Sequence, residues 1–249
     1  MNIQSEFRDI HKNKLAFILG AGVSITEADL SLIKPYITMC INESILLYNE
    51  PNYYLSCNGD SFTFGLFDKA SESKNTTLIT PGEFDFEKTY YNGQPYYKLP
   101  RKFKEKDCNL ANKDDTHLIV GATSTEVGAH LLYIMGCSPI VLLGIDACRL
   151  KGYQAFYFMP EYFNILPQKM KDKHGQTYGT FFNSLQANYQ KYHYDTYIGH
   201  IGIKIWEGFK QNSPDLNIIN CSVASKIDCF KKLTLEEVIK IYGGYNGSN

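Results

Sequence analysis

The stretch that decides the fold is Leu15-Ala-Phe-Ile-Leu-Gly-Ala-Gly-Val-Ser24, in which an apolar run leads directly into glycines. A short apolar run bounded by glycines is typical of a strand buried on both faces of a parallel sheet. The following residues, Glu27 to Ile33, indicate a helix capped by Ser24 or Thr26, and the free N–H groups of such a helix attract phosphate. We therefore predict a phosphate site formed by Gly20, Ala21, Gly22 and Ser24.

The glycines of this motif let the backbone turn sharply and approach a ligand closely. The third glycine of the dinucleotide-binding fingerprint is missing, however, and a tight turn without a ligand explains the pattern equally well. Both interpretations stay open at this point. In the first the amides of the turn bind a phosphate, and in the second they bind no ligand.

Polar residues follow the next two predicted strands. The strand Tyr36–Ile41 ends in Asn42, and the strand Tyr53–Cys57 ends in Asn58-Gly59-Asp60. Ligands of open α/β sheets bind beyond the carboxyl ends of the strands. We predict that Asn42 and Asn58 bind the base or sugar of a nucleotide, and that Asp60 binds a ribose hydroxyl or a metal through water. The alternatives are Asx turns for the asparagines and a helix cap for the aspartate.

The second half of the chain repeats the strand–helix–strand order of a parallel sheet. Thr123-Ser-Thr-Glu126 predicts a capped helix start, and Gly136 ends the helix. Pro139–Gly144 is the clearest strand of the sequence and leads to Asp146. A right-handed crossover follows from this order. We predict that Thr123, Ser124 and Thr125 contact the nucleotide. A role as helix cap explains Ser124 equally well. We also predict that Asp146 orients an acceptor hydroxyl.

Residues 1–249 are predicted to form a single α/β domain, because no linker or repeat divides them. Residues 83–112 have turn signals and little periodicity, which predicts an insertion with one hairpin. Residues 153–199 are rich in aromatic side chains and predict a lid. The remaining predicted elements are a helix over Phe62–Lys69, a strand over Thr76–Ile79 stopped by Pro81-Gly82, a helix over Ile201–Phe209, a strand over Leu216–Asn220 and a helix over Leu235–Tyr242 capped by Thr234.

Composition and charge exclude several classes of protein. A formal charge of −1 argues against a nucleic-acid binder. The seven cysteines and six histidines have no metal-ligand spacing, and the cysteine pattern suits a reducing compartment. The sequence has no signal-peptide core and no stretch long enough to span a bilayer. We expect a cytoplasmic protein without a metal site built from cysteine and histidine.

The order of the motifs resembles that of a known family. Together they are similar to the DUF115 proteins, which include the motility-associated factors of flagellin glycosylation, and to bacterial sialyltransferases of glycosyltransferase family forty-two. The closing part, from Ile219 to Glu237, is similar to the end of the DUF115 group. The motifs are Leu19-Gly-Ala-Gly-Val-Ser24, Ile41-Asn-Glu-Ser44, Asn58-Gly-Asp60, Gly121-Ala-Thr-Ser-Thr125 and Leu142-Leu-Gly-Ile-Asp146.

The resemblance implies a Rossmann-like, mostly parallel sheet flanked by helices, a variant of the GT-A type. It also implies transfer of a sialic-acid-like sugar from a CMP-activated donor to a hydroxyl of a glycan or protein, with inversion. Tyr197-Ile-Gly-His200 resembles the segment that carries the catalytic base, which makes His200 the base, approached through a turn. Tyr153 and then Tyr157 are the nearest counterparts of the tyrosines that hold the donor phosphate. Val23 and Thr125 depart from the Gly-Pro-Ser and Thr-Ser-Gly of those enzymes.

No cofactor is required by this interpretation, although Mg²⁺ is left open. The expected partners are a nucleotide-sugar and a glycan acceptor, with no nucleic acid, and with room for peripheral membrane association and for an oligomer. The resemblance points to a bacterial or phage source, and two other functions stay open. One is a magnesium-dependent diphosphokinase of the hydroxymethylpterin type, for which Asp60 and Asp146 are the available carboxylates. The other is a non-catalytic protein that binds a nucleotide or glycan.

Overall fold

The computed structural model describes residues 2–82, 85–101, 112–119, 123–191, 197–213 and 215–246, without the side chains of 188–201 and 245–246. Its described strands form one sheet in the order β5-β6-β4-β3-β2-β1-β7-β8-β9. Every neighbouring pair is parallel except β5 and β6. This confirms the predicted α/β class with a mostly parallel, Rossmann-like sheet. The strands are β1 (Ala16–Leu19), β2 (Ile37–Ile41), β3 (Tyr53–Leu55), β4 (Thr77–Gly82), β5 (Glu87–Tyr91), β6 (Gln94–Pro100), β7 (Ile140–Leu143), β8 (Ile218–Asn220) and β9 (Lys231–Lys232).

Strand β1 lies at the centre of the fold. Its Ala16 is paired with Ile37 of β2 on one side and with Ile140 of β7 on the other. All four of its residues are fully buried, as expected for a parallel strand covered on both faces. From β1 the chain winds outward to β4, and it later returns past β1 to β7. The strand order therefore reverses between β1 and β7, which is the place where sheets of this type bind ligands.

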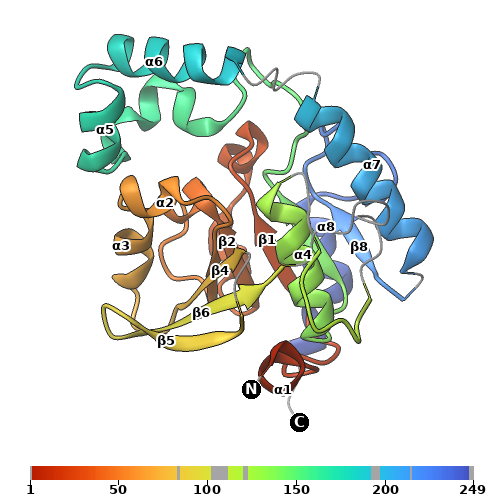
Figure 1. The fold of residues 1–249 in the computed structure, drawn as a ribbon. Helices are drawn as coiled ribbons and strands as arrows, with labels where there is room; N and C mark the ends of the chain where they lie inside the picture. The colour runs from red at the N-terminus through yellow and green to blue at the C-terminus, as the bar shows by residue number, and fades with distance from the viewer. Residues whose placement is uncertain are drawn as a thin grey trace.

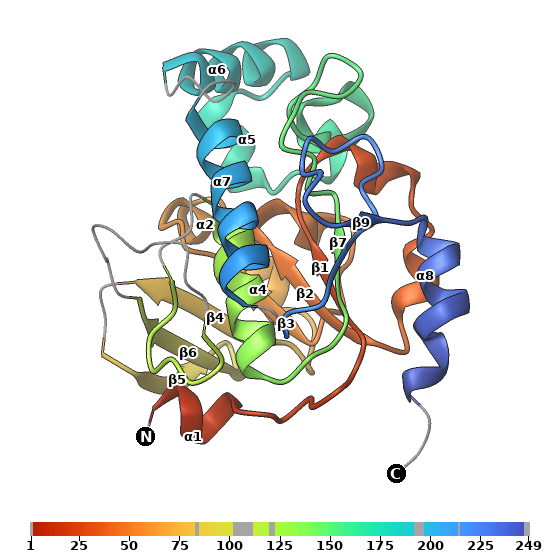
Figure 2. The same ribbon diagram turned by 90° about the vertical axis from the view of Figure 1, so that its right-hand side faces the viewer.

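One face of the sheet is covered by α1 (Ile3–Phe7), α4 (Ser124–Ile134) and α7 (Tyr197–Asn212). Ile18, Met39 and Leu142 point to this face and pack with Val127 of α4 and Trp206 of α7. Figures 1 and 2 show α4 against the sheet with α7 outside it. Because α4 is enclosed from both sides, nearly all of its residues are buried.

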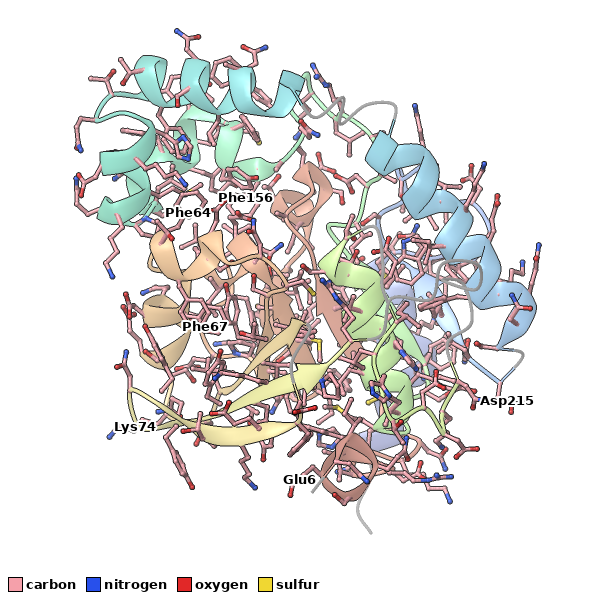
Figure 3. The ribbon with its side chains drawn as sticks, viewed as in Figure 1. Glu6, Phe64, Phe67, Lys74, Phe156 and Asp215 are labelled. Carbon is pink, nitrogen blue, oxygen red and sulfur yellow. The ribbon has the colours of Figure 1, made fainter. Side chains whose placement is uncertain are left out.

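The opposite face is covered by α2 (Asp60–Thr63), α3 (Leu66–Ser71), α8 (Leu235–Tyr242) and the short 3-10 helices η1 (Val23–Glu27), η2 (Leu30–Ile33) and η3 (Asn42–Leu46). Phe17, Tyr54 and Val141 alternate with the residues of the first face and point to this one. The rings of Tyr54 and Phe67 meet edge to face at 5.0 Å, and Figure 3 labels Phe67 on α3. None of the described helices has the length and apolar character to cross a bilayer.

A further layer lies beyond the carboxyl edge of the sheet, at the top of Figures 1 and 2. We call η4 (Phe156–Phe158), η5 (Pro160–Ile165), α5 (Gln168–His174) and α6 (Tyr178–Lys191) the cap layer. His174 of this layer packs on the ring of Phe64 at 5.4 Å, and Lys173 forms an ion pair of 3.3 Å with Asp60. Figure 3 shows Phe64 and Phe156 where the cap layer meets the core. The segment predicted as a lid is thus a helical layer over the sheet edge, and lid motion stays a prediction.

The predicted insertion contains the expected hairpin, formed by β5 and β6. Asn92 and Gly93 join these strands with φ angles of 49° and 81°, which is the type I′ turn that Asn-Gly favours. Strand β6 also pairs in parallel with β4, so the hairpin extends the main sheet. Residues 83–84 and 102–111 of the insertion lie outside the described residues.

Several predicted elements differ from the structure. The predicted helix over Glu27–Ile33 is wrong, since η1 and η2 are separate 3-10 turns. The predicted helix over Phe62–Lys69 is divided by Gly65, which has a φ of 77°. Strand β4 continues through the predicted stop at Pro81-Gly82, because the Gly82 carbonyl accepts a hydrogen bond from the Arg101 amide at 2.8 Å. The predicted turn at Tyr197 is the first turn of α7.

Candidate functional site

The carboxyl ends of the parallel strands bring several predicted site residues to one edge of the sheet. The loops after β1, β2, β3, β7 and β8 begin at this edge, and so does α4. Figure 1 shows this edge beneath the cap layer. The side chains of these loops therefore form the candidate site.

The loops after β1 and β7 are joined by Ser24 and Asp146. The Ser24 amide donates to Asp146 Oδ2 at 3.0 Å, and the Ser24 hydroxyl donates a short hydrogen bond to Oδ1. Asp146 is 3% exposed, and its carboxylate sits at the N-terminus of η1. A carboxylate of the protein itself thus accepts hydrogen bonds from Ser24, one of the predicted phosphate ligands. Burial raises the pKa of Asp146, and the hydrogen bonds from Ser24 and Ser222 partly oppose that rise.

Ser222, which follows β8, completes this connection. Its hydroxyl lies 3.0 Å from the Ser24 hydroxyl and accepts the Ile145 amide at 3.0 Å. The Ser222 amide in turn donates to the side chain of buried Asn220 at 2.9 Å. The loops after three neighbouring strands, β1, β7 and β8, are therefore held together by one buried polar network.

The glycines of the first loop allow the backbones of two loops to touch. A Cβ at Gly20 would lie 2.5 Å from the Gly144 carbonyl oxygen, and one at Gly22 would lie 2.6 Å from both that oxygen and Asp146. The Gly22 amide donates to the Gly144 oxygen at 2.7 Å, and the Gly20 amide donates to Leu143 at 2.8 Å. The amides of Gly20, Gly22 and Ser24 thus bind acceptors of the protein, and their phosphate-binding role stays a prediction.

Asn42 brings a buried side-chain oxygen to this edge of the sheet. It follows β2 directly and adopts a φ of 52°, a left-handed conformation that asparagine tolerates better than most residues. Its Oδ1 atom is buried, and no described residue donates a hydrogen bond to it. A buried carbonyl oxygen without a donor costs about 1–3 kcal/mol. A ligand N–H group would remove that cost.

The N-terminus of α4 lies at the same edge. Thr123 caps the helix by accepting the Thr125 amide at 3.3 Å, and the Thr123 amide donates to Glu126 at 2.8 Å. The Ser124 hydroxyl accepts the Cys57 amide at 3.3 Å, which connects the helix to the end of β3. Ser124 and Thr125 are 8% and 9% exposed. The predicted capped helix start is confirmed, but the cap is Thr123, so the alternative that made Ser124 the cap is wrong. Nucleotide contacts of these residues stay a prediction.

The residues after β3 lie closer to the surface. The Asn58 side chain accepts the Asp60 amide at 3.0 Å, which is the Asx turn given as its alternative. Asp60 is exposed at the start of α2 and pairs with Lys173 of the cap layer. The structure thus gives both residues a local partner. Asn42 and Asn58 differ in this respect, although their sequence contexts are similar.

Two further carboxyl groups at this edge have altered acidity. Burial raises the pKa of Glu43, next to Asn42, and of Glu126, on the first turn of α4, to about 7 in each case. Together with Asp146, three carboxyl groups from different elements are shifted in the same direction by burial. Carboxyl groups shifted in this way are often found at functional sites, because they can hold or release a proton near neutral pH.

His200 lies in the first turn of α7, and its side chain is outside the described residues. Nearby, Gly202 packs close to Glu126, since a Cβ there would lie 3.3 Å from Glu126 Oε1. The second turn of α7 therefore lies beside the first turn of α4. In the cap layer and its approach, Tyr153 lies near Phe182, and Tyr157 is buried against Phe158.

Three residues of this edge are not predicted as site residues from the sequence: Ser222, Glu43 and Glu126. Ser222 follows a predicted strand, so the carboxyl-edge rule that selects Asn42 also selects it. Glu126 belongs to a capping box, and the sequence pattern does not reveal that this box is buried. Within the described residues there is no group of three or more His, Cys, Asp or Glu side chains that could hold a metal.

Comparison with known proteins supports the fold. No protein-family model matches the sequence, and no curated protein matches it. Among solved structures, an MAf glycosyltransferase from Magnetospirillum magneticum AMB-1 is similar, with a TM-score of 0.51 and 15% identity over 89% of this chain. The chain spans about a third of that protein, since the match covers 34% of it. At this identity the likeness establishes the fold alone.

Proposed function

We propose that the chain is a glycosyltransferase-type domain that binds an activated nucleotide-sugar at the carboxyl edge of its sheet. The observation that carries the proposal is the buried Oδ1 atom of Asn42, for which no described residue provides a donor. A nucleobase amino group is a donor of the required kind. The fold likeness to an MAf glycosyltransferase supports the same function.

The position of Asn42 agrees with this proposal. It follows β2, the strand next to β1, and so lies close to the point where the strand order reverses. The Ser24–Asp146 connection holds the neighbouring loop in one conformation, so the site is largely formed before a ligand arrives. Preorganisation of this kind lowers the entropic cost of binding.

The finer proposal is transfer of a sialic-acid-like sugar from a CMP donor, with His200 as the base. The acceptor hydroxyl oxygen attacks the anomeric carbon while the bond from that carbon to the phosphate oxygen breaks. The electron pair of the broken bond leaves on CMP, and His200 receives the hydroxyl proton. A histidine suits this step because its unperturbed pKa lies close to neutral pH. Its support is the sequence resemblance and the place of α7 beside the N-terminus of α4.

The experiment that tests the function is ligand-induced thermal stabilisation with CMP, CDP, ATP and GTP, each with and without Mg²⁺. Stabilisation by CMP supports the proposed donor class. Stabilisation by ATP only with Mg²⁺ favours the diphosphokinase instead. Absence of a shift with every nucleotide contradicts the proposal, and binding without turnover of a CMP-sugar leaves a non-catalytic binding protein.

A further inference from the structure

A small pocket lies where the cap layer joins the loop after β7. Its polar lining includes Arg149, Gln154 and Gln186, and its aromatic lining consists of Tyr153, Phe158 and Phe182. These residues come from the loop after β7, from η4 and from α6. The pocket is thus formed by segments that are distant in sequence, and the Ser24–Asp146 connection lies outside it.

The loop side of the pocket has a defined shape. The amides and carbonyls of Leu150 and Tyr153 exchange two hydrogen bonds of 2.9 Å, and Lys151 and Gly152 have φ angles of 52° and 80°. These features describe a type I′ turn. The turn fixes the backbone between Arg149 and Gln154, which both line the pocket.

The aromatic side consists of rings that meet edge to face. Phe182 lies 6.1 Å from Phe158 at an interplanar angle of 90°, and 6.4 Å from Tyr153 at 81°. Such packing holds each ring in one orientation. Ring faces of this kind bind the C–H side of a sugar well, whereas the hydroxyl groups of the sugar need polar partners.

Gln154 determines which kind of ligand the pocket favours. Its Nε2 atom is buried, and the described part of the chain offers it no acceptor. A buried amide donor without an acceptor is costly, so a ligand with an oxygen acceptor would be stabilised there. A purely apolar ligand would leave that cost in place. Arg149 also lines the pocket, and its positive charge favours a ligand that carries negative charge.

The pocket is connected directly to the candidate nucleotide site. The Phe156 amide donates to the carbonyl oxygen of Ala21, in the loop after β1, at 3.0 Å. Gln154 is two residues before Phe156, and Arg149 is three residues after Asp146. A ligand that extends from the sheet edge into the cap layer would therefore reach this pocket.

We infer that the pocket binds a sugar that carries a carboxylate or several hydroxyl groups. One oxygen of this sugar accepts a hydrogen bond from Gln154 Nε2. This inference rests on the proposed function and adds a second subsite to it. The sugar is either the one carried by the donor or the terminal residue of the acceptor. Both have the oxygen acceptors and the ring face that the pocket requires.

The test is saturation-transfer NMR titration with two probes, the methyl glycoside of N-acetylneuraminic acid and methyl β-galactoside, in the presence of CMP. The variant Gln154→Leu removes the buried donor at similar volume and should keep its melting temperature. We expect its Kd for the bound probe to rise by about tenfold. The matched control Gln168→Leu changes an exposed glutamine of α5 and should bind as the wild type does.

Binding of the acidic probe supports a donor-sugar subsite, and binding of the neutral probe supports an acceptor subsite. Failure of both probes to bind wild type overturns the inference, as does an unchanged Kd in Gln154→Leu. Gln186→Leu replaces that variant if it does not fold. CMP-induced stabilisation of the same samples separates the two claims. CMP binding without sugar binding removes the subsite alone, whereas sugar binding without CMP binding removes the proposed function alone.

Discussion

Gly22 and Asp146 are so close that a Cβ on the glycine would lie 2.6 Å from the carboxylate oxygen Oδ2. Glycine is therefore needed at position 22 for the packing of the two loops, independently of any ligand. The close approach explains why the loops after β1 and β7 pack backbone against backbone. It also leads to a prediction about stability.

Gly22→Ala should lower the free energy of unfolding by about 1–3 kcal/mol, because the added methyl group overpacks the contact between the loops. Urea unfolding followed by circular dichroism measures this loss. Gly59→Ala is the matched control, since nothing lies within 4 Å of a Cβ at that position. Equal effects of the two substitutions would show that the loop contact is not tight.

Asp146→Ala should destabilise the protein by a similar amount, about 1–3 kcal/mol, because the amide and hydroxyl of Ser24 lose their acceptor. Asp60→Ala is the control, since its exposed ion pair with Lys173 is worth about 1 kcal/mol or less. Chemical denaturation of both variants compares them. A smaller loss in Asp146→Ala than in Asp60→Ala would contradict the structural role of Asp146.

Asn42→Gly should weaken nucleotide binding by about 1–3 kcal/mol and leave stability nearly unchanged. Glycine keeps the left-handed backbone at no steric cost and removes the buried oxygen that lacks a donor. Isothermal titration with CMP measures the affinity. Asn13→Gly is the matched control, because Asn13 is also left-handed, with a φ of 60°, but precedes β1 and is exposed; it should bind CMP as the wild type does. Equal CMP affinity of Asn42→Gly and wild type would place the base elsewhere.

Glu126→Gln should reduce the pH dependence of stability. Burial raises the pKa of Glu126 from 4.5 to about 7, so its contribution to folding is fully present below pH 4.5 and is lost as the pH rises through 7. The unfolding free energy of the variant should therefore fall less than that of wild type between about pH 5 and about pH 8. Glu43 and Asp146 shift in the same direction and keep part of the slope.

The control for Glu126 is Glu237→Gln. Glu237 belongs to the same kind of capping box at Thr234, on exposed positions of α8. Denaturation curves of this variant should keep the pH slope of wild type. If both glutamine variants have the same slope, burial of Glu126 does not govern the pH dependence.

His200→Ala should leave CMP binding nearly intact and lower turnover by about two to four orders of magnitude, the usual effect of removing a positioned base. In wild type the rate should fall on the acid side as the imidazole is protonated. Assays with a CMP-sugar and a glycan acceptor test this, with His117→Ala, an exposed histidine, as the control. Full turnover in His200→Ala would remove the base assignment.

The sequence predicts those parts of the fold whose signals are local. The apolar runs that end in glycine specify β1 and β7, and Asn92-Gly93 specifies the hairpin. The 3-10 turns of η1 and η2 are too short for a helical period to distinguish them from a helix. Their true form depends on the packing of the loops.

The candidate site was less accessible to prediction, because its key partners are far apart in the chain. Ser24 and Asp146 are separated by 122 positions, and nothing in either motif indicates that they bind each other. Glu126 and Glu237 belong to the same kind of local pattern, yet one is buried beneath α7 and the other is exposed. The local sequence predicts a capping box in both cases. The raised pKa of Glu126 results from its burial in the folded protein and cannot be predicted from that local pattern.

The central position of β1 has a consequence for synthesis of the protein. β1 ends at Leu19, whereas its second neighbour β7 begins at Ile140. During translation one side of this apolar strand therefore has no partner until the residues between Leu19 and Ile140 and then β7 have been made. Open apolar edges of this kind associate with other chains. A nascent or truncated chain that stops before β7 should consequently depend on chaperones to stay in solution.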